Sequence, residues 1–250
     1  MYPYIHITLP SYGVLAFIGG FFAMVFLFFR LEKYNVEFVA FLKLFVISVV
    51  GGVLGSKLLF AITQIPWLIE HFSLQNLILL IPQSGYVYYG GLFGVLFALY
   101  FVTKNDLEKR DNVFRLIVPA IPLFHAFGRI GCFMAGCCYG IELDNPINIG
   151  IFEFTRFPVQ IIEALFEFIM FILFSVLAYK KAKIYSLANY LLMYAVFRFL
   201  IEFKRGDEVR GIWAGGLSTA QYVSLIIVAI ILIKKVKLYH SLKDNAYSRA

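Results

Sequence analysis

The chain has 250 residues, of which 61% are hydrophobic and only 15% are charged, whereas soluble domains carry about 25% charged residues. This composition excludes an ordinary soluble domain. The formal net charge is +7, but the basic residues lie in short clusters between apolar blocks, which favours contact with anionic lipid heads and excludes nucleic acid as a partner.

The apolar blocks are about 18–25 residues long, the length that a helix needs to cross a bilayer. They predict an all-α, polytopic membrane protein with one domain, residues 1–250. In chain order the seven expected transmembrane helices are 12–29, 40–62, 86–103, 113–138, 158–179, 186–204 and 216–234. The first block has no basic region before it and no small-residue cleavage site after it, so we expect a retained span rather than a signal peptide.

The segment between the second and third spans is unusual for a loop. Residues 66–85 have the sequence PWLIEHFSLQNLILLIPQSG, which is too apolar for a solvated loop and too short to add a span. We expect an interfacial or re-entrant helix, with Trp67 near the lipid headgroups.

Basic residues alternate between the loops and predict the orientation. Residues 1–29 and 63–85 contain no Lys or Arg, whereas loops 104–112 and 180–185 are basic. The positive-inside rule then places the N-terminus outside and the C-terminus in the cytoplasm. The loop 204–211, KRGDEVRG, is basic on the outer side. Either the span count is off by one or these charges have a function outside, and the alternation of the other loops favours the second interpretation.

Ionisable residues occur inside the predicted fourth span. Residues 125–140 have the sequence HAFGRIGCFMAGCCYG, in which His125 and Arg129 are one helical turn apart. A charged side chain at bilayer depth costs about 2.5–3.5 kcal/mol on insertion scales, so such a residue indicates a functional site. An isolated histidine in an apolar helix is more often a hydrogen-bonded packing residue, and both interpretations of His125 stay open.

The predicted sixth span contains a second ionisable group. Arg198, Glu202 and Arg205 are spaced by four and three residues, so we expect them on one helix face. They could be an ion ladder that only offsets its own cost of insertion. A surplus of positive charge and the fit of guanidinium to phosphate oxygens favour a phosphodiester site.

The depth of the ionisable residues in the membrane distinguishes an enzyme from a transporter or a channel. A rise of 1.5 Å per residue places Arg129 about 24 Å from the inner end of its span and Glu163 about 8 Å below the outer edge. Tyr12 and Tyr89 lie at outer span ends. Transporters place polar groups near the midplane and channels line the full depth, so this distribution indicates an enzyme that acts on lipid headgroups of the outer leaflet.

Small residues surround the charged positions. Gly90, Gly91 and Gly128 allow close approach between helices, and a glycine beside Arg129 could also admit a bulky lipid head. The three cysteines, Cys132, Cys137 and Cys138, have a C-x4-C-C spacing that fits no standard zinc or redox pattern. We expect them to be packing residues of a helix, with no metal or cofactor.

At these positions the chain resembles the bacterial prolipoprotein diacylglyceryl transferases along nearly its whole length. The matching motifs are Tyr12-Gly13, GGVLGSKLLF at 51–60, YYGGLFG at 88–94, Gly128-Arg129 with Gly131, Arg156 with Pro158, Gln160, Glu163 and Ala164, Tyr194 with Arg198, Glu202 and Arg205, and Leu217-Ser218 with Gln221 and Ser224. Two positions depart from the family pattern: Tyr89 replaces a histidine, and Cys132 replaces an asparagine.

The resemblance implies a reaction in the bacterial plasma (inner) membrane. The diacylglyceryl group of phosphatidylglycerol would pass to the lipobox cysteine in the signal peptide of a prolipoprotein, giving a thioether and glycerol phosphate. Arg129, Arg198 and Arg205 would stabilise the leaving phosphate, and Glu202 would orient the arginines. Further substrate-binding residues would be Tyr12, Gly90, Gly91, Glu163 and Tyr194.

The attacking thiol has a free pKa near 8.5 and must become a thiolate. The candidate bases are Tyr89, His125, Glu163 and Glu202, and the sequence leaves this choice open. Two other functions are also open: a lipid-headgroup transferase with another acceptor, and a non-catalytic lipid-binding or transport protein.

Overall fold

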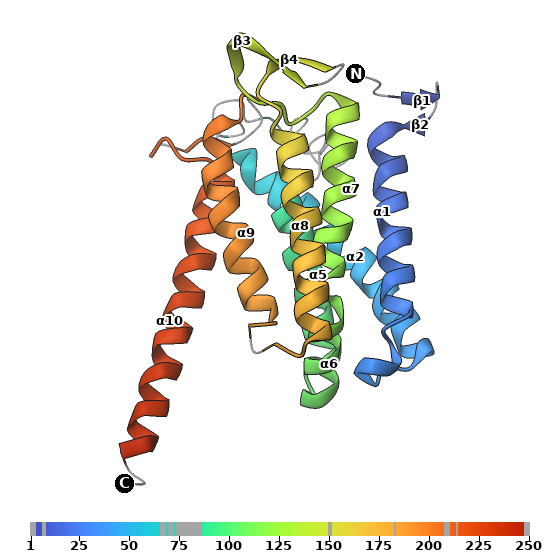
Figure 1. The fold of residues 1–250 in the computed structure, drawn as a ribbon, viewed down its shortest axis with the longest axis vertical. Coiled ribbons are helices and arrows are strands. Elements are labelled where there is room, and N and C mark those ends of the chain that lie inside the picture. The colour runs from blue at the N-terminus through green and yellow to red at the C-terminus, as the bar shows by residue number, and fades with distance from the viewer. Residues whose placement is uncertain are drawn as a thin grey trace.

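The computed structural model describes most of the chain as a helical bundle (Figure 1). The described residues are 4–6, 9–65, 69, 73, 87–149, 152–182, 184–207, 211–213 and 215–247. Nearly all of the predicted interfacial segment 66–85, including Trp67, lies outside them, and so does Arg210 of the basic loop.

Five helical stretches are long and apolar enough to cross a membrane, which confirms the predicted all-α, polytopic class. They are Ser11–Phe28 (α1), Phe38–Thr63 (α2), Leu107–Ala135, Val159–Tyr179 (α8) and Thr219–Lys237 within α10, which runs over Thr219–Tyr247. Two shorter helices, Tyr88–Thr103 (α5) and Leu187–Ile201 (α9), occupy the other two predicted spans.

Large apolar side chains cover the outside of the bundle. Phe17, Leu58 and Ile172 expose 76%, 66% and 60% of their surface. In water such a surface would favour association, but a helix that is apolar on all sides is the expected form of a membrane span. Lipid offers no hydrogen-bonding groups to the backbone. The backbone N–H and C=O groups of a span therefore bond to one another, which an α-helix achieves.

The predicted fourth span has different boundaries in the structure. The predicted loop 104–112 already contains the start of α6, Leu107–Ile117, where the Asp106 carboxylate accepts a hydrogen bond of 2.9 Å from the Lys109 N–H. Helical hydrogen bonding is interrupted at Pro119, which has no N–H to donate. Helix α7 then runs over Ala120–Ala135 and ends at Gly136, whose φ of 74° is left-handed. The helical stretch Leu107–Ala135 thus begins and ends a few residues earlier than the approximate span 113–138 expected from the sequence.

The predicted sixth span also ends early. Helix α9 stops at Ile201 and is followed by a 3-10 turn, η2, over Glu202–Lys204. Arg205 then has extended backbone and forms an isolated β-bridge with Gly140. Arg205 is therefore not on the helix face of Arg198, contrary to the prediction from spacing.

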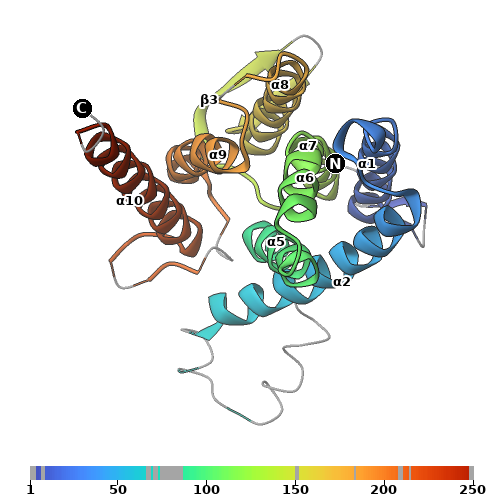
Figure 2. The same ribbon diagram turned by 90° about the horizontal axis from the view of Figure 1, so that it is seen from below.

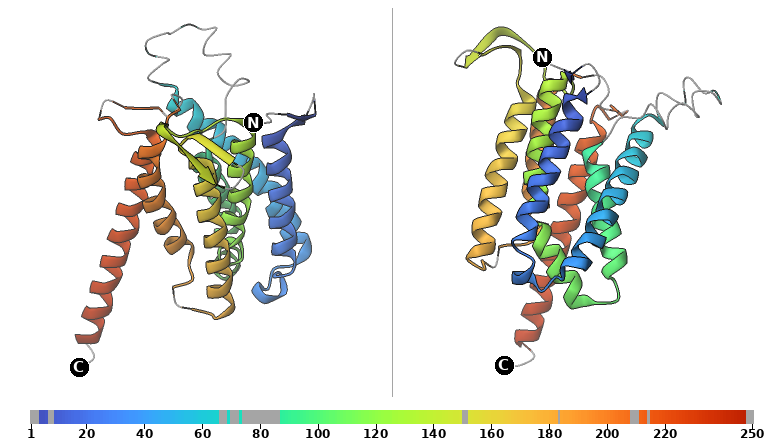
Figure 3. Two further views of the ribbon diagram at one scale, coloured as in Figure 1. Left: turned by 45° about the horizontal axis from the view of Figure 1, so that its top comes forward. Right: turned by 90° about the vertical axis from the view of Figure 1, so that its right-hand side faces the viewer.

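Two short antiparallel hairpins, absent from the sequence prediction, lie at one end of the bundle (Figure 3). Tyr4–His6 (β1) pairs with Leu9–Pro10 (β2), and Glu142–Ile149 (β3) pairs with Phe152–Arg156 (β4). We call this the hairpin end. Helices α1 and α8 begin there and α7 ends there, whereas α6 and the last turns of α10 lie at the opposite end (Figure 1).

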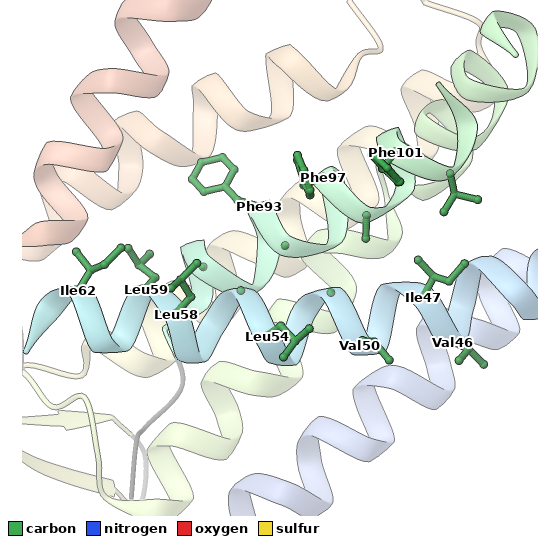
Figure 4. A pocket seen from close by; sticks show the side chains of 16 residues that line it. Val46, Ile47, Val50, Leu54, Leu58, Leu59, Ile62, Phe93, Phe97 and Phe101 are labelled. Carbon is green, nitrogen blue, oxygen red and sulfur yellow. The ribbon is translucent and has the colours of Figure 1, made fainter. Parts of the chain in front are cut away.

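Glycines bring α2 and α5 into backbone contact beside the rest of the bundle (Figure 2). A Cβ atom on Gly90 would collide with the Gly55 carbonyl, and one on Gly94 would collide with the Gly51 carbonyl. Along the same pair runs a groove of about 750 Å³ whose labelled side chains are all hydrocarbon (Figure 4). Its chemistry suits lipid chains rather than headgroups.

Candidate active site

A buried carboxylate on α8 joins arginines from two other helices. Glu163 is paired with Arg129 of α7, and its Oε1 accepts a hydrogen bond of 2.6 Å from Nη1 of Arg198 on α9. All three side chains are buried. Each residue lies within two turns of the hairpin end of its helix, so helices distant in sequence meet at this point.

The ion pairs continue beyond the end of α9. Nη2 of Arg198 lies 2.6 Å from Oε2 of Glu202, which is 3.8 Å from Nη1 of Arg205. Arg205 also donates two hydrogen bonds to the Asp207 carboxylate, of 2.8 and 2.5 Å. We call the six residues the ion-pair chain: Arg129, Glu163, Arg198, Glu202, Arg205 and Asp207.

The ion-pair chain is formally neutral, which corrects the expected surplus of positive charge. The prediction counted Arg198, Glu202 and Arg205 alone, but Glu163 and Asp207 add two carboxylates that balance the arginines. Arg129 still has a spare donor, because its buried Nε has no hydrogen-bond partner among the described residues. A phosphate would therefore find a pre-positioned guanidinium here, in competition with Glu163.

A second polar group lies beside the ion-pair chain and includes a residue that sequence reasoning missed. Nδ1 of His125 is 2.9 Å from Oε1 of Glu167, and the Tyr190 hydroxyl donates to Oε2 of Glu167 at 3.2 Å. The Tyr88 ring stacks on His125 with centroids 3.4 Å apart. Glu167 is fully buried. Its place four residues after Glu163, in an apolar helix, was the signal that could have revealed it.

Glu167 extends the polar region towards the middle of the bundle. It lies eight residues into α8, or about 12 Å at the rise of a helix. Glu167 therefore lies deeper than Glu163 but still in the half of α8 nearer the hairpin end.

Tyr89 forms a bridge between helices. Its hydroxyl is 2.8 Å from Oγ of Ser224, and Ser224 donates its own proton to the Ala220 carbonyl at 2.7 Å. Tyr89 is therefore the donor, and its proton is held by α10. The Tyr194 ring lies edge-on to both Tyr89 and His125, with centroids 5.4 Å away in each case.

The remaining predicted site residues lie at helix contacts. Tyr12 packs at Gly131 where α1 meets α7, and a Cβ on Gly131 would lie 3.2 Å from Cα of Tyr12. Gly90 and Gly91 face α2, so the structure does not bring them to the ion-pair chain. Next to Arg129, a Cβ on Gly128 would meet nothing within 4 Å, which leaves open space on that side of α7.

The cysteines are not three packing residues of one helix, contrary to the prediction. Cys132 lies in α7, whereas Cys137 and Cys138 follow the helix end. The Cys137 N–H donates to the Cys132 carbonyl at 3.1 Å, and Nε2 of Gln160 donates to the Cys137 carbonyl at 2.8 Å. All three Sγ atoms lie within 4.8 Å of one another. Thiol hydrogen bonds from Cys132 and Cys137 hold the pKa of Cys138 below its usual range.

This fold and this site define a class of protein: a polytopic membrane protein with a buried chain of arginines and carboxylates at one end. A family model described as prolipoprotein diacylglyceryl transferase matches residues 3–236. The chain belongs to the prolipoprotein diacylglyceryl transferase family.

Individual relatives agree with this assignment. A phosphatidylglycerol–prolipoprotein diacylglyceryl transferase of Clostridium tetani is 32% identical over 233 residues, covering 88% of this chain and 89% of the relative. The second such enzyme of Clostridium perfringens is 32% identical over 195 residues, covering 73% of each chain. One from Helicobacter pylori strain G27 is 30% identical over 234 residues, covering 86% of this chain and 82% of the relative.

Proposed function

We propose that this protein transfers the diacylglyceryl group of phosphatidylglycerol to the lipobox cysteine thiol of prolipoproteins. The single observation that supports this most is the ion-pair chain, because the residues that match the family motifs meet there from three helices. The names of the relatives supply the two substrates.

In the proposed reaction the acceptor thiol gives its proton to a base, and the thiolate sulfur attacks the glyceryl carbon that is bonded to the phosphate ester oxygen. A C–S bond forms, the C–O bond breaks, and glycerol phosphate leaves with the bonding electrons. Arg129 and Arg198 would stabilise the leaving phosphate, since guanidinium groups held in a dry site need no reorganisation as charge develops. Glu163 and Glu202 would hold these arginines in place.

We also propose the location and orientation of the protein. Its place is the bacterial plasma membrane, with the hairpin end and the N-terminus outside and the C-terminus in the cytoplasm. The basic loops 104–112 and 180–185 support this orientation, and secreted prolipoproteins would reach the ion-pair chain from the hairpin end. The apolar groove of α2 and α5 would contact acyl chains of membrane lipids.

The test is a reconstituted assay with phosphatidylglycerol and a lipobox peptide, which follows thioether formation and glycerol phosphate release together. Both products should appear with the parent protein and fall at least about 100-fold in Arg129→Ala, since lost transition-state donors cost this much. Arg115→Ala is the matched control, because Arg115 is half exposed on α6 and, within the part of the chain that the structure describes, forms its salt bridge with Asp111 alone.

If the protein binds phosphatidylglycerol but forms no thioether, the lipobox cysteine is not its acceptor. That result would favour a lipid-headgroup transferase that uses another acceptor. Coupled uptake of a solute, with no chemical product, would instead favour the transport alternative.

A further inference from the structure

The three cysteines form a cluster of sulfur atoms that the proposed reaction has not yet used. Cys132, Cys137 and Cys138 place their Sγ atoms within 4.8 Å of one another, and all three are free thiols. Among the described residues this is the one group of three or more His, Cys, Asp and Glu side chains with the spacing of a metal site.

The backbone is specifically shaped to bring the sulfurs together. Gly136 ends α7 with a φ of 74°, and Cys138 itself has a φ of 58°. A left-handed φ is uncommon for a residue other than glycine and occurs where the surroundings impose it. Here Gln160 holds the Cys137 carbonyl, and the Tyr139 carbonyl accepts a hydrogen bond of 3.0 Å from the Gly206 N–H. The loop is thus fixed from α8 and from the end of α9.

The sulfur cluster has the donor set of a catalytic zinc site. Zinc binds thiolate at about 2.3 Å in tetrahedral geometry, so ligand sulfurs lie about 3.8 Å apart. The separations found here need only a small contraction. Structural zinc sites use four protein ligands, whereas catalytic sites use three and leave the fourth position open. Three sulfurs therefore match the catalytic pattern.

The charges around the cluster also suit such a complex. Zinc with three thiolates has a net charge of −1, and a fourth thiolate makes it −2. Nη1 of Arg129 donates to Sγ of Cys132 at 3.8 Å. Nearby guanidinium groups stabilise an anionic complex and orient its ligands. The same Arg129 pairs with Glu163, so the cluster adjoins the ion-pair chain.

We propose that Cys132, Cys137 and Cys138 bind one Zn²⁺ ion, whose open fourth position receives the acceptor cysteine thiol. This inference rests on the proposed function. The acceptor thiol loses its proton to water when it coordinates, since a metal-bound thiol is deprotonated. Its sulfur then forms the C–S bond while the C–O bond to phosphate breaks. The thioether product is uncharged and leaves the metal, so the cycle closes without oxidation or reduction.

Cobalt substitution tests the site independently of activity. Reduced parent protein in detergent is titrated with Co²⁺, and one ion per chain should give sulfur-to-cobalt charge-transfer absorption with tetrahedral d–d bands. Cys137→Ser should weaken Co²⁺ binding at least about tenfold. Mutating a residue that only hydrogen-bonds to a metal ligand already lowers metal affinity by about this factor, and Cys137 would be a ligand itself. Ala135→Ser is the matched control, since it adds a hydroxyl at the end of α7 without removing a sulfur. Protection of the three thiols from alkylation by Zn²⁺ is measured on the unchanged protein and needs no variant.

The acceptor is tested by adding a lipobox peptide to the cobalt form. The cysteine peptide should shift the d–d bands, and the same peptide with serine should not. A reduced parent protein that binds neither Co²⁺ nor Zn²⁺ overturns the inference, and so does a protein that is isolated without metal and with a Cys137–Cys138 disulfide. If that metal-free protein still forms thioether, the proposed function holds and only the metal site is wrong. If metal binds and the peptide shifts the bands but no thioether forms, the metal site stands and the proposed function fails.

Discussion

At the scale of single residues, Glu163 is the point on which two arginines converge. Its carboxylate pairs with Arg129 and with Arg198, and all three side chains are buried. Removing one partner from such a pair leaves a buried charge without compensation, which is far more damaging than losing an exposed pair.

We therefore expect Glu163→Gln to lower the free energy of unfolding by about 3–5 kcal/mol. The measurement is thermal or denaturant unfolding in detergent, followed together with lipid transfer. Glu153→Gln provides the control, because Glu153 is exposed on β4. A Glu163→Gln protein as stable and active as the control would show that the two arginines are held by other groups.

Tyr89 provides the second prediction at this scale. Its hydroxyl donates to Ser224, which in turn donates to the Ala220 carbonyl. A hydroxyl engaged in this way braces α5 against α10 and is not free to accept the proton of a thiol. Tyr89→Phe should keep transfer activity within about threefold and lower stability by about 1 kcal/mol, the net worth of one hydrogen bond. Loss of activity with unchanged stability would make Tyr89 a catalytic group.

At the scale of elements, helix contacts were harder to predict than helices. Blocks of apolar residues predicted the spans because lipid favours any apolar helix of sufficient length. The ends of α7 and α9 depend on local backbone events, the left-handed Gly136 and the bridge between Arg205 and Gly140. Periodicity does not report such events, and so the prediction carried both helices too far.

The pairing of Glu163 with Arg129 and Arg198 could not be predicted from the sequence either. The three residues belong to helices separated by more than thirty positions in the chain, and spacing rules apply only within one helix. The cysteine cluster shows the same limit, because a turn and not a helical repeat brings its sulfurs together. Sequence patterns could identify the charged residues but not their partners.

The contact between α2 and α5 gives a prediction at the scale of elements. Gly94→Ala should lower the free energy of unfolding by about 1–3 kcal/mol, because the added Cβ meets the Gly51 carbonyl and the helices must separate. Gly128→Ala is the matched control on α7, where a Cβ meets nothing within 4 Å. Unfolding in detergent compares the two variants. Equal stability would show that α2 and α5 do not pack closely in the membrane.

At the scale of the whole molecule, one end holds the chemistry. The hairpins, the ion-pair chain and the cysteine cluster all lie at the hairpin end, whereas the exposed, charged face of α6 lies at the other (Figure 1). A lipid headgroup and a secreted acceptor can meet there only if that end faces outwards.

Labelling with a membrane-impermeant thiol reagent tests this orientation. Asp144→Cys, on β3, should react in intact cells, whereas Lys109→Cys, on α6, should react only after the membrane is opened. The unchanged protein supplies the background from the native cysteines. The reverse pattern would contradict the proposed orientation and with it the access of prolipoproteins to the site.

The most direct test of the central claim compares Arg198→Ala with the parent protein in the reconstituted transfer assay. Arg198 is buried and joins Glu163 to Glu202, so its loss should abolish both thioether formation and glycerol phosphate release. Arg115→Ala should leave both unchanged. If folded Arg198→Ala still forms thioether at the parental rate, the ion-pair chain is not the site at which the diacylglyceryl group is transferred.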